Sequence, residues 1–241
     1  TSHDGIMVLD SGKIGTPAAE HFNLNSDYQL EIGLTPNRCD AMGHIGVARD
    51  IKAFLNYHKN KSLELKLPEN ISYKDEGSKS LEIQIEEPKL CSTYIGATIE
   101  GVEISDSPDW LQKALRSIDV EPINNVVDIT NYVMFEYGTP LHAFDLNQIN
   151  EKVVVKKGKK NDIFKTLDGI DRKLTGEELM ITNGESNLCM AGVYGGLGSG
   201  VSQETTALFI ESDLFDATSV RKTAKTPGLQ TDARFRFELG V

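Results

Sequence analysis

The chain has 241 residues, of which 39% are hydrophobic, and its length allows one large domain or two smaller ones with a sizeable core. Its 36 acidic residues outnumber its 25 basic residues, which gives a formal net charge of −11. This sign excludes a protein that wraps bare nucleic acid with its whole surface, so any nucleic-acid contact must be local.

Cysteine usage and hydropathy indicate where the protein works. Cys39, Cys91 and Cys189 lie far apart without a C-x-x-C pair, which indicates neither a disulfide framework nor a zinc ribbon and favours a reducing compartment. No apolar run approaches the roughly 18 residues of a membrane span, and the first residues lack a signal-peptide pattern. We therefore expect a cytoplasmic protein with no membrane partner. Because the chain opens without Met and stops at "RFRFELGV", we also expect a piece excised from a longer protein.

The N-terminal part of the chain predicts few regular elements. Residues 28–34, "YQLEIGL", alternate in a way typical of a strand, and "TPNRCD" then predicts a turn into a helix with Asp40 as its N-cap. Residues 59–79 are polar and rich in lysine, with a proline, a glycine and several serines, which predicts a linker or an irregular edge. We place a domain boundary near residue 87.

Strands and helices follow one another in the next segment. Alternation predicts two strands, at residues 81–85 and 94–104. Ser107 and Pro108 predict the N-cap and the first residue of a helix. The segment 126–137 predicts another helix, which Gly138 ends.

The C-terminal part adds strands, a hairpin and a helix. "VVVKK" at residues 153–157 predicts a strand, as do "LMITN" and "ALFIES", and Asp168-Gly169 is a strong hairpin signal. A helix through "ATSVRKTA" is broken at Pro227 and Gly228. Mixed strands, helices and hairpins predict an α+β or mixed α/β fold.

A glycine-rich run suggests two different interpretations. Its glycines are Gly192, Gly195, Gly196, Gly198 and Gly200. A phosphate loop passes directly into a helix and needs a lysine, whereas this run leads into the strand-like "SQETTALFIE". We favour a bend where backbones pack closely, or a floor that lets a ligand approach the main chain.

Glu211 ends the apolar run "ALFIE". A carboxylate at the buried end of a strand is uncommon, because removing it from water costs free energy unless it has a partner. One interpretation is an ion pair with Arg221 or another base. The other is an acceptor that waits for a donor on a ligand.

The stretch "VDITNYVMFEYGTPLHAFD", residues 127–145, raises the same choice for four polar residues. His142 taken alone is more often a hydrogen-bonded core residue than a catalyst, and with Asp145 it provides too few ligands for zinc. Thr130 and Asn131 are adjacent on the predicted helix, and their side chains can simply bond to their own turn. Alternatively, these residues form one wall of a pocket.

Two basic clusters stand out against the acidic background. The first is "KVVVKKGKK" at residues 152–160, and the second is the basic segment 218–241. Either can touch phosphates. For the first we favour a solvated edge that resists aggregation.

Four long motifs resemble one family. They are "LTPNRCDAMGHIGVARDI", "INNVVDITNYVMFEYGTPLHAFD", "TLDGIDRKLT" and the segment from "GVYGGLGSGV" to "RFRFELG". Together they resemble the beta subunits of bacterial phenylalanyl-tRNA synthetases, in the family's order and over most of the chain. The resemblance implies that residues 1–87 are the remnant of a mainly helical N-terminal domain plus a linker, without the tRNA-binding OB-fold insertion. Residues 88–241 are then an editing domain of mixed sheets with flanking helices.

The resemblance also implies a function and a site. The family's editing domain hydrolyses tyrosine mischarged onto tRNA(Phe). Carried over motif by motif, the catalytic residues are His142 of "PLHAFD" and Asn131 of "VDITNYV". The substrate-binding residues are Glu211 of "FIES", Thr130, Thr231 and Ala233 of "QTDA", and no metal is implied. Tyr194, Arg234 and Leu239 depart from the family's pattern, and Arg234 borders the implied site.

The family further implies partners and cofactors. The editing domain takes the 3′ end of tRNA(Phe), and the subunit joins an alpha subunit in an (αβ)2 heterotetramer. This fragment needs no cofactor of its own, while the full enzyme uses ATP and Mg2+ for phenylalanylation. Two alternatives remain open. One is a non-catalytic module that supports structure and positions tRNA, and the other is a phosphate-binding or metal enzyme that uses the glycine run and His142.

Overall fold

The structure is a computed structural model that describes residues 7–9, 11–22, 24, 28–69, 72, 80–225 and 228–241. The chain divides into two compact units, Thr1–Ile32 and Gly33–Val241. The described part of the first unit contains one short helix, α1 (Ala18–His21). The second unit contains the other helices and all the strands that the structure describes.

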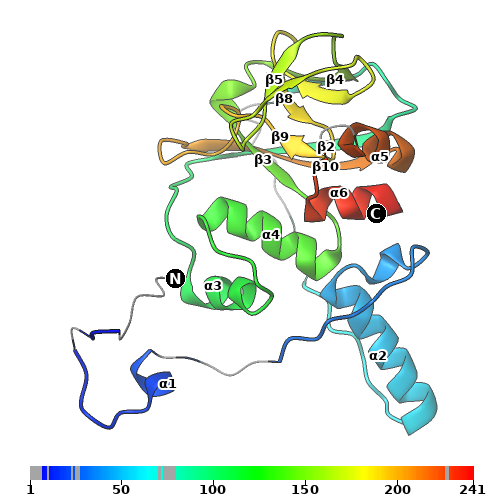
Figure 1. The fold of residues 1–241 in the computed structure, drawn as a ribbon. Coiled ribbons are helices and arrows are strands. Elements are labelled where there is room, and N and C mark those ends of the chain that lie inside the picture. Colours follow the sequence, from blue (N-terminus) through cyan, green and yellow to red (C-terminus); the bar gives the residue numbers. More distant parts are fainter. Residues whose placement is uncertain are drawn as a thin grey trace. The chain divides into compact units, whose positions relative to one another are not determined.

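The second unit mixes helices and strands along the chain (Figure 1). Its helices are the short 3-10 helices η1 (Cys39–Ala41) and η2 (Leu146–Gln148) and the α-helices α2 (His44–Lys59), α3 (Asp109–Arg116), α4 (Asn125–Tyr137), α5 (Ala217–Lys225) and α6 (Asp232–Leu239). Its strands are β1 (Glu82–Ile85), β2 (Cys91–Glu100), β3 (His142–Asp145), β4 (Lys152–Lys157), β5 (Ile163–Lys165), β6 (Asp171–Lys173), β7 (Leu179–Thr182), β8 (Asn187–Met190), β9 (Tyr194–Gly195) and β10 (Ala207–Phe215). The predicted α+β or mixed α/β class is confirmed.

The strands form three sheets. The largest has the order β1-β4-β7-β8-β9, in which β1 and β4 are parallel and the other pairs are antiparallel. The second is antiparallel with the order β2-β10-β3, so β10 is its central strand. The third is the hairpin β5-β6, which contains the predicted Asp168-Gly169 turn.

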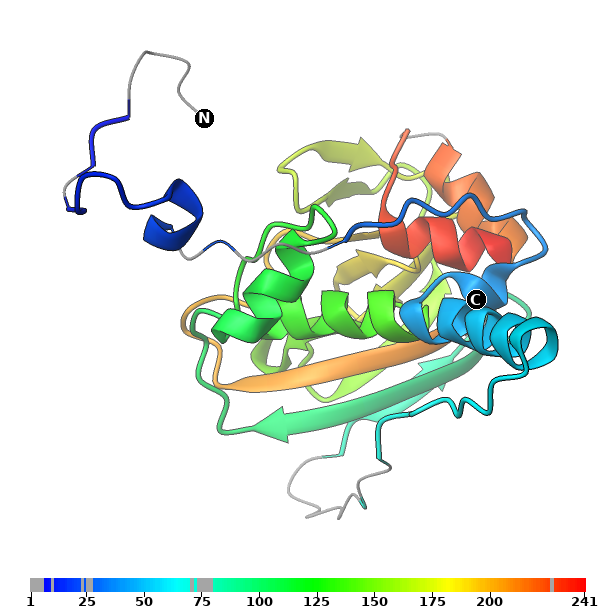
Figure 2. The same ribbon diagram turned by 90° about the horizontal axis from the view of Figure 1, so that it is seen from below.

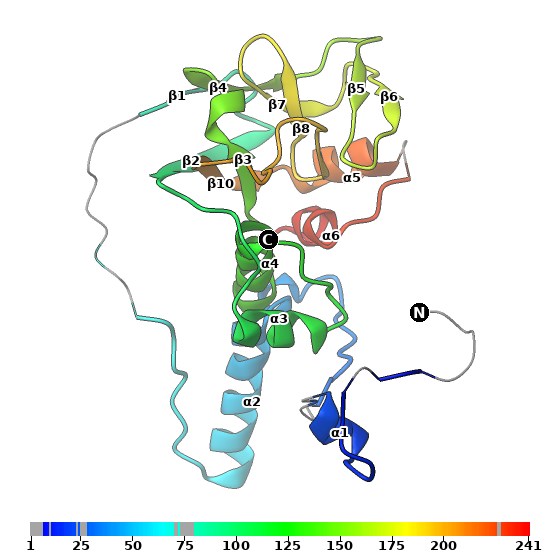
Figure 3. The ribbon, with the colours of Figure 1, turned by 90° about the vertical axis from the view of Figure 1, so that its left-hand side faces the viewer.

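The main core lies between the two larger sheets. It contains Phe144 and Phe209 from the three-stranded sheet and Val153, Val155 and Ile181 from the five-stranded sheet. Figures 1 and 3 show the three-stranded sheet between the five-stranded sheet and α4. The three-stranded sheet is therefore covered on one face by the main core and on part of the other by α4, while Ile95 and Ile99 of β2 remain exposed.

A smaller core covers the second face of the three-stranded sheet. Val126 of α4 packs there with Ile104, Ala143 of β3 and Leu208 of β10. Side chains alternate along a strand, so Ala143 and Leu208 point away from the face that carries Phe144 and Phe209. The helix α4 thus covers the face opposite the main core.

Local interactions define both ends of α4. The side chain of Asn124 accepts hydrogen bonds from the backbone N–H groups of Val126 (3.1 Å) and Val127 (3.0 Å), which caps the helix. Gly138 ends it in the left-handed conformation (φ 90°), as predicted. A Cβ atom on Gly43 would lie 2.5 Å from the backbone nitrogen of Gly138. The start of α2 can therefore meet the end of α4 directly (Figure 2).

Several local predictions are wrong. Residues 28–34 are not in a strand. The N-cap of α2 is Gly43, whereas Asp40 lies in η1 and binds the guanidinium of Arg38 (2.9 Å). The N-cap of α3 is Pro108, and the hydroxyl of Ser107 instead donates to Asp128 (2.5 Å). In both cases the predicted cap binds another side chain instead.

The lysine-rich segment 152–160 does not form a sheet edge. Its strand β4 lies between β1 and β7, with all three valines buried and the lysines at its ends. Residues 60–69 are irregular, as predicted, while the rest of the expected linker, apart from residue 72, lies outside the described residues, as does Pro227. Within the described part of the chain, no helix has both the length and the apolar character of a membrane span.

The domain boundary near residue 87 stays a prediction. Strand β1 precedes it and pairs in parallel with β4, which follows it. The predicted helices and strands after residue 80 are otherwise confirmed within a few residues of their expected ends.

Candidate functional site

Glu211 lies in the middle of the central strand β10. Its partners across the sheet are Gly96 of β2 and His142 of β3. Residues directly opposite in an antiparallel pair point to the same side, so Glu211 and His142 share the face that meets the main core. The Glu211 residue is 4% exposed. The sheet thus holds a buried carboxyl group beside a half-buried imidazole.

The partner of Glu211 is a phenol. The hydroxyl of Tyr94 donates a hydrogen bond to Oε2 of Glu211. Tyr94 is 8% exposed, and its ring stacks on Phe209 with centroids 6.3 Å apart. The alternative ion pair with Arg221 is wrong, because that guanidinium donates to the carbonyl oxygen of Glu238 (2.8 Å).

Burial disfavours the charged form of the two carboxyl groups in this region. It raises the pKa of Glu211 to about 8, while the hydrogen bond from Tyr94 acts in the opposite direction. Asp213, two residues on and on the same face, has a pKa raised to about 10 by burial and by the charge of Glu211. No ion pair of the described residues includes either carboxyl group. At neutral pH both groups are therefore mainly protonated.

His142 is the first residue of β3. Its Nε2 atom is buried and has no hydrogen-bond partner within the described part of the chain. Burial lowers the pKa of His142 to about 4, so the imidazole is neutral at pH 7. Its ring meets the edge of Phe144 (4.5 Å between centroids), and a Cβ on Gly195 would lie 3.1 Å from its Cε1 atom. A neutral imidazole with an unsatisfied nitrogen is available to hold a ligand or a water molecule.

Thr231 lies near the same glycine-rich segment as His142. Its hydroxyl caps α6 by accepting from the backbone N–H of Arg234 (3.0 Å) and donates to the carbonyl of Val193 (3.2 Å). Val193 is two residues before Gly195, which His142 approaches. Ala233 is half-buried in the first turn of α6. The structure therefore places His142 and Thr231 against one segment of the chain, and Glu211 beside His142 in the sheet.

Thr130 and Asn131 belong to α4, which covers the other face of the sheet. The hydroxyl of Thr130 donates to the carbonyl of Val127 (2.8 Å), so the expected bond to its own turn is confirmed. Asn131 is half-buried. Among the described residues, no hydrogen bond joins either side chain to Glu211 or His142. The structure does not bring this pair into contact with the buried carboxyl group.

The glycine run packs closely and does not form a phosphate loop. A Cβ on Gly196 would lie 2.5 Å from the carbonyl oxygen of Leu188 and 2.9 Å from the ring of Phe164. The run contains β9 and leads into β10, without an intervening helix. The phosphate-loop interpretation is therefore wrong, and the close-packing interpretation is confirmed.

His142 and Asp145 do not share a site. They are three residues apart on one strand and so point to opposite faces. The carboxylate of Asp145 accepts hydrogen bonds from the hydroxyl of Thr205 (2.7 Å) and the backbone N–H of Asn147 (2.9 Å). In the part of the chain that the structure describes, no cluster of three or more His, Cys, Asp or Glu side chains has a metal-binding arrangement.

The arginines of the basic segment 218–241 are used within the fold. Arg234 donates to the carbonyl of Leu229 (3.0 Å) and pairs with Glu238 (2.8 Å). Arg236 lies over the ring of Phe135, 4.7 Å from its centroid, and links α6 to α4. Arg234, which departs from the family's pattern, is thus bound by residues in and just before its own helix. Tyr194, which also departs from that pattern, packs against the main core.

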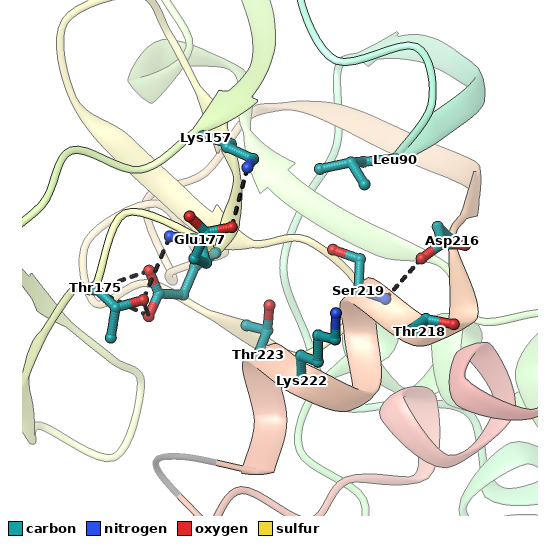
Figure 4. A pocket seen from close by; sticks show the side chains of 10 residues that line it. Leu90, Lys157, Thr175, Glu177, Asp216, Thr218, Ser219, Lys222 and Thr223 are labelled. Carbon is teal, nitrogen blue, oxygen red and sulfur yellow. Dashed lines mark hydrogen bonds and ion pairs between the residues drawn. The ribbon is translucent and has the colours of Figure 1, made fainter.

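A surface cavity of about 370 Å³ lies elsewhere in the second unit (Figure 4). Its lining comes from the end of β4, the segment before β7 and the start of α5, and includes the ion pair between Lys157 and Glu177 (3.1 Å). None of the six predicted site residues lines it. Its volume alone does not connect it with the chemistry of the buried carboxyl group.

Sequence reasoning missed Tyr94 and Asp213. Asp213 follows Glu211 at the spacing of one strand face, and this signal was available. The contact of Tyr94 depends on the pairing of β2 with β10, residues separated by more than a hundred positions, which no local pattern reveals.

Comparisons with known proteins agree with the motifs. The family model of the B3/4 domain matches residues 90–241. The phenylalanine--tRNA ligase beta subunits of Bacteroides fragilis and Porphyromonas gingivalis are 48% and 47% identical to the chain, over 100% of its length and 30% of theirs. A crystal structure of an N-terminal fragment of the Pyrococcus horikoshii phenylalanyl-tRNA synthetase beta subunit matches with a TM-score of 0.42 and 18% identity, covering 79% of this chain and 58% of that one.

The family model and the two curated relatives confirm the resemblance that the motifs predict. The chain spans about a third of the length of the curated relatives. The family model covers well over half of the chain, including α3 to α6 and β2 to β10. The chain therefore belongs to the B3/4 domain family.

Proposed function

We propose that this chain is the part of a phenylalanine--tRNA ligase beta subunit that hydrolyses tyrosine mischarged onto tRNA(Phe). One observation carries the proposal: the buried carboxyl group of Glu211 already holds a phenol hydroxyl, beside an imidazole with an unsatisfied nitrogen. The names of the relatives supply the substrate class, since they are phenylalanine--tRNA ligase beta subunits.

Polarity provides the selectivity that such a site needs. An apolar pocket that accepts phenylalanine rejects tyrosine by only about a hundredfold, so a second site has to remove the error. Phenylalanine is the smaller residue, so size cannot exclude it from that second site. A buried carboxyl group left without its phenol partner costs free energy, and sites of this kind discriminate by roughly 10⁴ to 10⁵. Glu211 is the proposed specificity residue.

Hydrolysis of the ester needs orientation more than a strong base. An aminoacyl ester is activated, so holding a water molecule and the terminal ribose in place supplies much of the rate. We assign this role to His142, whose neutral imidazole both donates and accepts. Asn131 is proposed to assist from α4, where it would contact the bound ribose and not His142 or Glu211 directly. Thr130, Thr231 and the main chain at Ala233 are proposed to hold the amino acid. No nucleophilic triad is part of the proposal.

The wider setting is proposed with the function. The chain receives the 3′ end of tRNA(Phe), and the complete beta subunit joins an alpha subunit in an (αβ)2 enzyme in the cytoplasm. This part needs no cofactor, while the complete enzyme uses ATP and Mg2+. The acidic surface is consistent with a local contact, because the other domains and the alpha subunit supply most of the affinity for tRNA.

The test compares the decay of preformed tyrosyl-tRNA(Phe) and phenylalanyl-tRNA(Phe), with the 241-residue chain and with the complete αβ enzyme. The parent should hydrolyse the tyrosyl ester selectively. Glu211→Gln keeps the side-chain volume but replaces the carboxyl O–H with an amide, and we expect it to lower tyrosyl hydrolysis about tenfold, as for the loss of one hydrogen bond to a neutral group. Glu204→Gln, on the exposed loop before β10, is the matched control. A Glu211→Gln enzyme with the parent's selectivity would contradict the proposal.

One observation favours a second candidate, a non-catalytic module that supports structure and positions tRNA. The hydroxyls of Thr130 and Thr231 are both engaged in helix contacts. If this candidate is correct, Thr130→Val and Thr231→Ala should lower the unfolding midpoint and leave tyrosyl-ester hydrolysis at the uncatalysed rate in parent and variants alike.

A further inference from the structure

Tyr94 is held more firmly than its contact with Glu211 alone requires. Its ring belongs to the main core and stacks on Phe209 with an interplanar angle of 15°. Phe209 is itself confined by β2, because a Cβ on Gly96 would lie 2.2 Å from the end of its ring. The phenol of Tyr94 therefore has little freedom to leave the carboxyl group.

The contact also follows a diagonal across the sheet. Tyr94 is directly opposite Asp213 in the β2-β10 pairing, yet its hydroxyl donates to Glu211, whose direct partner is Gly96. Diagonal neighbours in a sheet lie within reach of an aromatic side chain. Gly96 has no side chain, and the ring of Phe209 takes the space that a Cβ there would need. The Oδ1 atom of Asp213 is buried without a partner among the described residues.

The hydrogen bond uses one oxygen of the carboxyl group. Tyr94 donates to Oε2, and among the described residues this is the hydrogen bond that the structure gives to the Glu211 side chain, which leaves Oε1 to accept another donor. Because the hydrogen bond holds Oε2 of the buried carboxyl group in place, the direction in which Oε1 points is also fixed. The second oxygen is then a preorganised acceptor, which binds a donor without first giving up rotational freedom.

We propose that Tyr94 is a positioning residue for selectivity: it fixes Glu211 through Oε2 so that Oε1 receives the phenol of a tyrosyl ester. This inference rests on the proposed function. The opposite role, in which Tyr94 blocks the site and a substrate displaces it, requires the ring to leave Phe209 and the core. The packing of Tyr94 argues against that displacement.

The experiment removes only the hydroxyl. Tyr94→Phe keeps the ring and its stacking, and the complete αβ enzyme is assayed for kcat/KM with tyrosyl-tRNA(Phe) and phenylalanyl-tRNA(Phe). We expect the tyrosyl-to-phenylalanyl ratio to fall about tenfold, which corresponds to about 1.4 kcal/mol. Tyr57→Phe, on the exposed part of α2, is the matched control and should leave the ratio unchanged.

A double-mutant cycle separates positioning from simple support of the fold. If Tyr94 acts through Glu211, Tyr94→Phe should have little further effect on the ratio in a Glu211→Gln background. A carbon-13 label on the Glu211 carboxyl gives an independent signature. Because the hydrogen bond from Tyr94 lowers the pKa of Glu211, Tyr94→Phe should raise the titration midpoint of that carbon.

The outcomes are distinct. If the parent shows no tyrosyl selectivity, the proposed function fails and this inference fails with it. If Glu211→Gln loses selectivity while Tyr94→Phe keeps it and only unfolds more easily, the proposed function stands and Tyr94 is structural. A higher ratio in Tyr94→Phe also overturns the inference, because it would show that the phenol of Tyr94 competes with the substrate.

Discussion

Glu211 and His142 face each other across the β10-β3 pair, and burial acts on each in the direction that removes charge. Burial raises the pKa of the acid and lowers the pKa of the base. Two neutral groups that both donate and accept hydrogen bonds suit the proposed substrate, an uncharged phenol on an ester, better than a charged pair would. Because both groups are neutral, Glu211 can be buried without a compensating cation.

His142 gives a pH-dependent prediction. Its pKa is about 4 in the folded protein and near 6.5 when exposed, so the unfolded state binds the proton more readily. The neutral form is favoured in the fold above pH 6.5, and its contribution is lost as the pH falls from about 6.5 towards 4. We expect the free energy of unfolding to fall over this range with a slope of up to about 1.4 kcal/mol per pH unit from this residue.

Urea unfolding of the parent and His142→Gln between pH 4 and 7.5 measures this slope. The variant lacks the titrating group, so the difference between the two proteins should change across the window and stay constant above it. A difference that is independent of pH would show that the imidazole titrates alike in both states.

Sequence reasoning was effective for single residues that violate a simple rule. Glu211 stood out because a carboxylate at the end of an apolar strand needs a partner, and the structure shows that it has one. The identity of that partner was not predictable. It depends on which strands pair and in what register, and alternation within one strand says nothing about either.

At the scale of elements, α4 depends on contacts at its two ends. Asn124 caps its start, and Gly138 in the left-handed conformation ends it. The buried carboxylate of Asp128 strengthens the first turn by accepting from the hydroxyl of Ser107 and the backbone N–H of Ile123 (2.8 Å). The proposed substrate contacts at Thr130 and Asn131 therefore rest on a helix whose first turn is well fixed.

Removing the cap should destabilise this helix. Asn124→Ala leaves the backbone N–H groups of Val126 and Val127 without their acceptor, and we expect a loss of about 1 kcal/mol in the free energy of unfolding. Chemical denaturation measures the change. Asn147→Ala, at an exposed position in η2, is the control and should be nearly neutral. Equal stability of both variants would mean that the cap contributes nothing.

The sequence predicts helices and strands well where the spacing of apolar residues determines the element. It predicts the ends of helices less well, because a contact with another side chain can determine which residue is the cap. The strands and helices after residue 80 follow from alternation and helical spacing, because those patterns place apolar side chains in the core. Ser107 and Asp40 are suitable caps by residue type, but each binds another side chain. The alternation in residues 28–34 is not enough for a strand, which forms only where another strand pairs with it.

At the scale of the whole molecule, the charges are distributed in a way that limits contact with nucleic acid. The chain carries a formal net charge of −11. Arg221, Arg234 and Arg236 are engaged with carbonyl oxygens, a carboxylate or an aromatic ring. Few guanidinium groups in this C-terminal segment are therefore available to phosphates.

This distribution predicts weak, salt-tolerant binding of tRNA by the chain alone. A protein that neutralises six to ten phosphates loses about 10³ to 10⁵ in affinity between 50 and 200 mM salt. We expect this chain to lose about tenfold or less over the same range, measured by fluorescence anisotropy with labelled tRNA(Phe). A short oligonucleotide that carries only the 3′ end should bind about as well as the whole tRNA. A steep salt dependence would show an extended phosphate-binding surface.

The burial of Glu211 beside Tyr94 also determines when the cost of dehydrating the carboxyl group arises, during folding or during ligand binding. The carboxyl group loses its water when the two sheets close on it, so a ligand arriving later does not have to remove that water. The cost falls on the stability of the fold, where a hydrophobic side chain at this position would have contributed instead. The buried carboxyl group thus lowers the stability of the fold, and in the proposed function it is already dehydrated when the substrate binds. In a variant selected only for a higher melting temperature, we expect a hydrophobic side chain to replace Glu211.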